Sequence, residues 1–149
     1  MVPPRLSLRP MGIAHKDYSG TPLPKKLGVR EGSRVLLAGV PDGFELGTLP
    51  SGAELLRSAR APLDVAVQFV TRRSELERRF AKLASALAPT GRLWVAWPKK
   101  AAKVDTDLTF ETVQRHGLDT GLVDNKSASI DDVFQGLQFV YRLEDRPKP

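Results

Sequence analysis

The amino-acid sequence predicts an α/β domain: a three-layer sandwich of about five strands, mostly parallel, with an antiparallel last strand. Three observations predict it. Strand and helix signals alternate along residues 21–143. The first apolar runs are nearly continuous, which is typical of parallel strands covered on both faces. Helix-starting sequences of the form Ser-x-x-Glu stand between these runs. Residues 1–20 and 144–149 lack a periodic pattern, so we expect flexible tails outside this single domain.

The first elements are a short helix and a buried strand. Thr21 can cap the helix, Pro22 suits its first position and Gly28 ends it. Residues 34–39 then form an apolar run bounded by glycine, which predicts the first strand.

A second helix is expected between the first two strands. Ser51 and Glu54 have the spacing of a capping box, in which each side chain satisfies a free backbone amide, and this helix would end before Pro62. Residues 63–70 are mostly apolar and predict the second strand.

The best helical pattern follows the second strand. Ser74 and Glu77 form another capping box, and the helix should continue to about Ala88. Its basic side chains should lie mostly off the apolar face. The apolar side chains recur at helical spacing on that face, at Leu76, Phe80, Leu83 and Leu87.

The remaining part of the domain contains three strands and one helix. Asp107 or Thr109 can cap the helix, and Gly117 should end it. Because the connection between the last two strands is short, these strands should pair antiparallel. The three strands are predicted at residues 92–97, 122–129 and 137–143.

Composition excludes several classes of protein. The 149 residues contain no cysteine, which excludes disulfides, thiol catalysis and thiolate metal sites, and the two histidines lie too far apart in the chain to suggest a metal site. The longest apolar run, at residues 93–97, is far shorter than the roughly 20 residues of a membrane helix. Because the N-terminus lacks the apolar core of a secretory signal, we expect a cytoplasmic protein.

The net charge of +6 is unevenly distributed. Residues 72–103 contain nine basic and two acidic side chains, whereas the last third of the chain is acidic. A basic segment of this kind can attract a polyanion such as nucleic acid. The alternative is a solubilising mixture of charges on helix faces.

The order of several segments resembles class I S-adenosylmethionine-dependent methyltransferases. Residues 27–43 resemble the opening of that family, with its short helix, first strand and glycine-rich loop. Residues 63–67 resemble its fourth strand, with Asp64 as the leading acid, residues 87–95 its fifth strand, and residues 137–143 its closing antiparallel strand. The resemblance implies a shortened Rossmann-like, methyltransferase-like sheet, in which the five predicted strands lie in the order 1-2-3-5-4.

The departures from that family concern the cofactor site. Leu37 stands where the family has an acid, and Pro41 where it favours a loop glycine. Only residues 44–63 separate the loop from the next strand, where the family places a helix and two strands, one ending in the acid that binds the ribose hydroxyls. The resemblance therefore implies loss of the adenosine half of the site, and we expect no cofactor. It also leaves the first strand at an open edge, which residues 11–28 could cover or a homodimer could pair.

The chain also resembles a family of short bacterial proteins of unknown function. The shared motifs are TPLPKKLG at residues 21–28, LWVAWPKK at 93–100, TDLT at 106–109 and GLVD at 121–124. This second resemblance spans nearly the whole chain and implies no activity.

The candidate ligand-binding residues follow strands whose carboxyl ends should form one rim of the sheet, where open α/β sheets bind ligands. Lys99 and Lys100 could hold a phosphate or carboxylate there, and Trp97 could stack on a flat ring. The alternative is that Trp97 packs in the core and the lysines are solvated.

Two further candidates belong to the same rim. Gly39, Asp42 and Gly43 follow the first strand and form either a ligand loop or an ordinary tight turn. Asp107 is either a helix cap or a polar group facing the Lys99 loop. No catalytic residue and no metal ligand is predicted.

Three functions remain open at this stage. The first is a non-catalytic or regulatory module that binds a small anionic ligand or a protein, because the cofactor half of the site is missing. The second is a minimal methyltransferase, which should bind S-adenosylmethionine saturably. The third is nucleic-acid association through residues 72–103, which should weaken steeply with salt.

Overall fold

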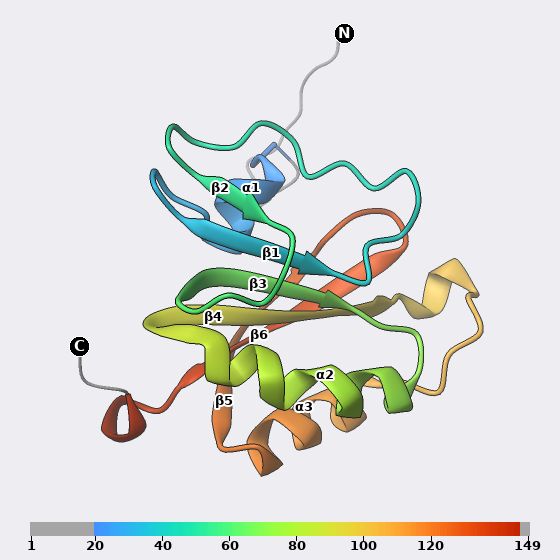
Figure 1. Cartoon of the computed structure of the whole chain (residues 1–149). Helices are drawn as coiled ribbons and strands as arrows, with labels where there is room; N and C mark the ends of the chain where they lie inside the picture. The colour runs from blue at the N-terminus through green and yellow to red at the C-terminus, as the bar shows by residue number, and fades with distance from the viewer. Residues whose placement is uncertain (1–19, 147–149) are drawn as a thin grey trace, which may run out of the picture.

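The computed structural model describes residues 20–146, and its centre is a six-stranded sheet with the strand order β2-β1-β3-β4-β6-β5 (Figure 1). β1 to β4 are parallel to one another, and β6 is antiparallel to both β4 and β5. The predicted α/β class, the order of the five predicted strands and the antiparallel last strand are confirmed. The strands are β1 (Arg34–Ala38), β2 (Glu54–Leu56), β3 (Leu63–Phe69), β4 (Leu87–Pro98), β5 (Leu122–Ser129) and β6 (Phe134–Tyr141).

Helices cover both faces of the sheet (Figure 1). An apolar cluster lies between the helices and the sheet on each face. α2 (Arg73–Ala86) and α3 (Phe110–Asp119) pack on one face, and α1 (Leu23–Leu27) packs on the other. Trp94 lies in the cluster under α1, and Trp97 lies in the cluster under α2 and α3. Side chains on successive strand positions point to opposite faces, which explains why the two tryptophans separate.

Two single turns of 3-10 helix, η1 (Lys100–Ala102) and η2 (Leu143–Asp145), complete the described chain. η2 overlaps the start of the predicted C-terminal tail, 144–149, and its residues are exposed. The predicted N-terminal tail, 1–20, lies outside the described residues except for Gly20. Among residues 20–146, no helix combines the length and apolar character needed to cross a bilayer.

The helix predicted from Ser51 and Glu54 is wrong, because this segment forms the edge strand β2. Gly52 has φ +75, and Gly32 donates its backbone N–H to the Ser51 carbonyl over 3.0 Å, so the chain turns here. Glu54 then enters a parallel ladder with Arg34 instead of folding back on Ser51. Pairing with β1 thus overrides the local capping signal. It also covers the edge of β1 that was expected to be open, which removes the reason for an edge-to-edge homodimer through β1.

The long helix α2 begins earlier than the Ser74–Glu77 spacing predicts. Its N-cap is Arg72, and the capping carboxylate is Glu75, which accepts hydrogen bonds from the backbone N–H groups of Thr71 (2.9 Å) and Arg72 (3.3 Å). Glu77 instead accepts from Arg73 one helical turn away, over 3.2 Å. The helix ends at Ala86, where β4 begins directly.

Glu75 should make the stability of the protein pH-dependent. The hydrogen bond from Thr71 lowers the pKa of Glu75 below its usual 4.5, against the effect of burial, which raises it. A lowered pKa means that this stabilisation is complete above about pH 4.5 and is lost as the pH falls through the folded-state value. We therefore expect Glu75→Gln to flatten the acid branch of stability, measured by urea unfolding from pH 7 to pH 3. Glu77→Gln is the matched control; an equal flattening in both variants would contradict this role of Glu75.

The ends of the two other helices also differ from prediction. Pro22, not Thr21, is the N-cap of α1, and no side-chain cap is present there, whereas Gly28 ends that helix as predicted, at φ +89. Thr109 caps α3 as predicted, accepting from the Thr112 N–H over 3.1 Å. Gly117 does not end α3 but lies inside it. A glycine is required there because a Cβ at this position would collide with the Phe139 ring of β6. Close packing, not chain reversal, explains this glycine.

Candidate functional site

The carboxyl ends of the parallel strands form one rim of the sheet, as expected. Gly39 follows β1 at this rim with φ +70, and a Cβ there would lie 2.6 Å from the Phe69 carbonyl oxygen at the end of β3. Only glycine fits where the chain passes so close to the neighbouring strand. Asp42 and Gly43 lie further along the same loop, are exposed, and belong to a turn in which Phe44 donates its N–H to Pro41 over 3.2 Å.

The predicted residues at the end of β4 and just after it do not line a site with Gly39. Trp97 is 2% exposed and packs in the core, where it cannot stack on a ligand. Lys99 donates to the Ser129 hydroxyl over 2.8 Å and so lies over the turn between β5 and β6. Lys100 is exposed at the start of η1.

Asp107 faces α2 rather than the Lys99 loop. Its carboxylate accepts the backbone N–H of Arg73, the first residue of α2, over 2.8 Å. Beside it, Thr106 donates to the Thr71 carbonyl over 2.6 Å and Asp105 pairs with Arg72, whose pKa this hydrogen bond raises. The loop after β4 is thus tied to the start of α2, and these polar groups already have partners.

A cavity of about 330 Å³ lies beside Gly39 on the face covered by α2, and we call it the rim pocket. Its polar side chains are basic: Arg79 and Lys82 from α2, and Arg57 from the loop after β2, next to Ser58. No acidic side chain lines it among the residues that the structure describes. The apolar wall comes from Leu36, Leu37, Ala38, Ala59 and Leu83.

Arg79 is the cation closest to the glycine. Its guanidinium lies 3.1 Å from the position that a Gly39 Cβ would occupy, and the side chain is partly buried. Lys82 follows one helical turn later on the same side of α2 and is exposed; Arg78 is also exposed but does not line the pocket. The geometry can hold an anion between three positive side chains, a glycine loop and a serine hydroxyl.

Of the predicted ligand residues, only Gly39 lines this pocket. Sequence reasoning placed Arg79 and Lys82 on a solvated helix face, and it assigned Arg57 to no site. The one available signal was the three-residue spacing of Arg79 and Lys82, which puts both on one side of a helix. Nothing in the local sequence relates Arg57 to them, because β2 was not predicted.

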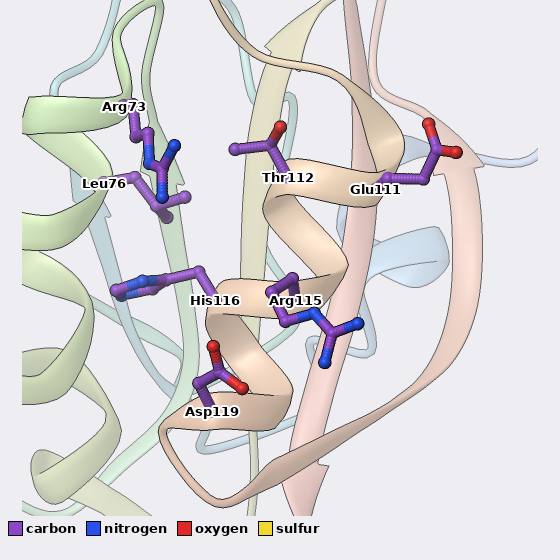
Figure 2. A pocket seen from close by; sticks show the side chains of 7 residues that line it. All are labelled: Arg73, Leu76, Glu111, Thr112, Arg115, His116 and Asp119. Atoms are coloured by element: carbon purple, nitrogen blue, oxygen red, sulfur yellow. The ribbon is translucent and has the colours of Figure 1, made fainter.

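A second cavity, of about 280 Å³, lies between α2 and α3 (Figure 2). Figure 2 shows His116 pointing from α3 toward α2, near Leu76 on the pocket floor. The imidazole meets the Phe80 ring edge-on, with centroids 5.1 Å apart, which is a packing contact. Charges of both signs surround it, including Arg73 and Asp119. This cavity has no excess of either charge.

The basic side chains of residues 72–103 do not form one surface. Arg79 and Lys82 line the rim pocket on the α2 face, Arg92 faces the opposite side of the sheet, and Arg72 is paired with Asp105. Nucleic-acid association stays a prediction, without a continuous basic stripe to support it. Within the described chain, no group of three or more histidine or carboxylate side chains is placed to hold a metal ion.

Several solved structures superimpose on most of this chain. The fibrillarin pre-rRNA processing protein of Methanococcus jannaschii superimposes with a TM-score of 0.53 at 12% identity, covering 76% of this chain and 68% of that one. A TehB-like methyltransferase of Corynebacterium glutamicum gives 0.53 at 13% identity, covering 75% and 82%. Magnesium protoporphyrin IX methyltransferase of Synechocystis, with bound S-adenosylmethionine, gives 0.52 at 10% identity, covering 80% and 74%.

Comparisons by sequence find no match: no protein-family model matches the chain, and no curated protein matches it. At identities of 10–13%, structural similarity is evidence for the fold and not for the chemistry. This protein has the α/β fold of class I S-adenosylmethionine-dependent methyltransferases, with a six-stranded mixed sheet.

Proposed function

We propose that this protein is a non-catalytic module that binds a small anion, a carboxylate or phosphate compound, in the rim pocket beside Gly39. The observation that carries the proposal is the charge of that pocket, with three basic side chains and no acidic one among its described lining residues. Its place supports the same function, since ligands of open α/β sheets bind at the carboxyl ends of the strands. Its volume of about 330 Å³ lies at the small end of the range for ligand pockets.

The same residues argue against S-adenosylmethionine as the ligand. Its sulfonium group is positively charged, so three surrounding cations without a carboxylate would repel it. Arg57 directly follows β2, the strand beside β1, and its guanidinium donates hydrogen bonds but cannot accept one from a ribose hydroxyl. Pro41 offers no N–H in the loop after β1. The rim therefore does not fit this cofactor, and we propose no methyl transfer.

We also propose that the chain belongs to the family of short bacterial proteins that share the motifs at residues 21–28 and 93–100. Because that family implies no activity, its membership does not change the proposed function. Both motifs lie outside the rim pocket. A test of the function must therefore address the pocket residues themselves.

Thermal unfolding with citrate or inorganic phosphate tests the proposal. We expect saturable stabilisation of the native protein, because a ligand at 100 times its Kd adds about 2.7 kcal/mol to the free energy of unfolding. Arg79→Gln and Lys82→Gln should each weaken binding by roughly tenfold or more, since each removes a charge-assisted contact. Arg78→Gln, on the same helix but outside the pocket, is the matched control and should bind like the native protein.

Calorimetry with S-adenosylmethionine and with the anions tests the proposal against its alternatives. Saturable S-adenosylmethionine binding that Arg79→Gln leaves intact would favour the minimal methyltransferase instead. Anion binding that is equally strong in Arg79→Gln, Lys82→Gln and Arg78→Gln would remove the rim pocket as the site.

A further inference from the structure

A second basic concavity lies on the opposite face of the sheet from the rim pocket. It is bounded by α1, by residues 48–50 and by β4, and it has a volume of about 620 Å³; we call it the α1 groove. Lys25, Arg30, Arg92 and Lys126 line it, together with apolar side chains, and no acidic residue does so among those described. The volume is within the usual range for small-molecule sites.

Arg92 is the central cation of this groove. It lies on β4 beside Val65, its side chain is partly buried, and it passes next to the residue that ends α1. That residue is Gly28, and a Cβ there would collide with the Arg92 guanidinium. The glycine thus leaves space for the arginine as well as ending the helix.

Arg92 has no counter-charge within residues 20–146. The three ion pairs of the described chain involve other arginines, and no hydrogen bond from the Arg92 side chain is formed there. Nearby carbonyl oxygens of α1 are already engaged: Leu27 accepts from the Trp94 indole N–H over 3.0 Å, and Lys26 accepts from the Lys126 ammonium over 3.0 Å. Burial lowers the pKa of Arg92, and the charge of Arg30 lowers it further. A partly buried guanidinium beside another cation is unfavourable until an anion joins it.

We propose that the α1 groove binds the phosphate group of a small phosphate ester, with Arg92 as its central contact. The planar guanidinium matches two phosphate oxygens, and Lys25, Arg30 and Lys126 supply the surrounding positive charge. Pro24, Leu49 and other apolar groups of the wall can contact the organic part of the ligand.

A small ligand fits the groove better than a nucleic-acid strand does. The cations converge on one concavity instead of following a track along the surface, and the lining contains no aromatic side chain on which a base could stack. Trp94 is fully buried beneath this face and is not available for stacking.

Calorimetry on the full chain tests the site with four probes: pyrophosphate, adenosine monophosphate, adenosine and a short single-stranded oligonucleotide. We expect the two small phosphate compounds to bind and adenosine not to bind. Arg92→Met should weaken phosphate binding roughly 10- to 100-fold, the size of a lost hydrogen bond to a charged group. Arg78→Gln should leave it unchanged. Any phosphate binding that is lost in the rim variant Arg79→Gln belongs to the rim pocket and should remain in Arg92→Met, which separates this proposal from the proposed function.

The ligand-free protein provides a second readout. Because Arg92 is partly buried and has no counter-charge among residues 20–146, Arg92→Met should raise the Tm in phosphate-free buffer by roughly 2–4 °C. A structural arginine with a native partner would lower it. The proposal is overturned if Arg92→Met destabilises the ligand-free protein, if it binds the phosphate probes like the native chain, or if only the oligonucleotide binds.

Discussion

Replacing Trp94 with alanine is expected to lower the free energy of unfolding by about 3–5 kcal/mol, the usual cost of truncating a buried tryptophan. Trp94 is 0% exposed on the α1 face of β4, and its indole N–H donates to the Leu27 carbonyl over 3.0 Å. The variant would lose the apolar contacts, leave a cavity and leave this carbonyl without its partner. Since the free energy of unfolding of small domains is only about 5–15 kcal/mol, the variant would lose a large part of its total stability.

Urea unfolding followed by circular dichroism measures this effect. Trp94→Phe keeps most of the apolar volume and should cost less, about 1–3 kcal/mol, mainly for the unsatisfied Leu27 carbonyl. Leu143→Ala removes an apolar side chain that is 77% exposed and should change stability by less than about 0.5 kcal/mol. If Trp94→Ala unfolds at the same urea concentration as Leu143→Ala, Trp94 does not hold α1 on the sheet.

Introducing valine at Gly117 is expected to cost about 3 kcal/mol, at the upper end of the range for overpacking. The new side chain would meet the Phe139 ring, which is 0% exposed and itself packs edge-on against Phe80, with centroids 5.4 Å apart. Neither ring can move without disturbing the other. The gain in helix propensity over glycine is only a few tenths of a kcal/mol and does not offset the clash.

A double variant separates overpacking from other causes. Phe139→Leu creates space next to residue 117, so Gly117→Val combined with Phe139→Leu should be less destabilised than the sum of the two single variants. Arg115→Val introduces valine on an exposed position of α3 and should cost at most about 0.7 kcal/mol. Additive costs in the double variant would mean that Gly117 is needed for some other reason than contact with Phe139.

Elements with a strong periodic or apolar pattern could be predicted from the sequence. β3 and β5 lie within a residue of their predicted ranges, and the face of α2 that carries Leu76, Phe80 and Leu83 is buried as expected. Errors arose where one local signal had two interpretations. Ser51 and Glu54 have capping-box spacing, but hydrogen bonds to the distant β1 stabilise a strand there instead.

The candidate site was predicted less well than the fold. The rim was expected at the carboxyl ends of the strands, and Gly39 does lie beside a pocket there. The cations of that pocket were missed because α2 and the loop after β2 meet only in the folded chain. Lys99 and Asp107, by contrast, have partners in neighbouring segments, Ser129 and Arg73, that spacing along the chain does not reveal.

The sequence by itself determined the alternation of buried strands and amphipathic helices, because hydrophobic periodicity depends only on neighbouring residues and on which face can be buried. It also determined the antiparallel last strand, through the short connection before it. The tertiary structure alone decided which charges meet: Arg57 with Arg79 on one face of the sheet, and Arg30 with Arg92 on the other. These encounters depend on strand order and helix placement, and charge interactions reach across space to residues that are far apart in the chain.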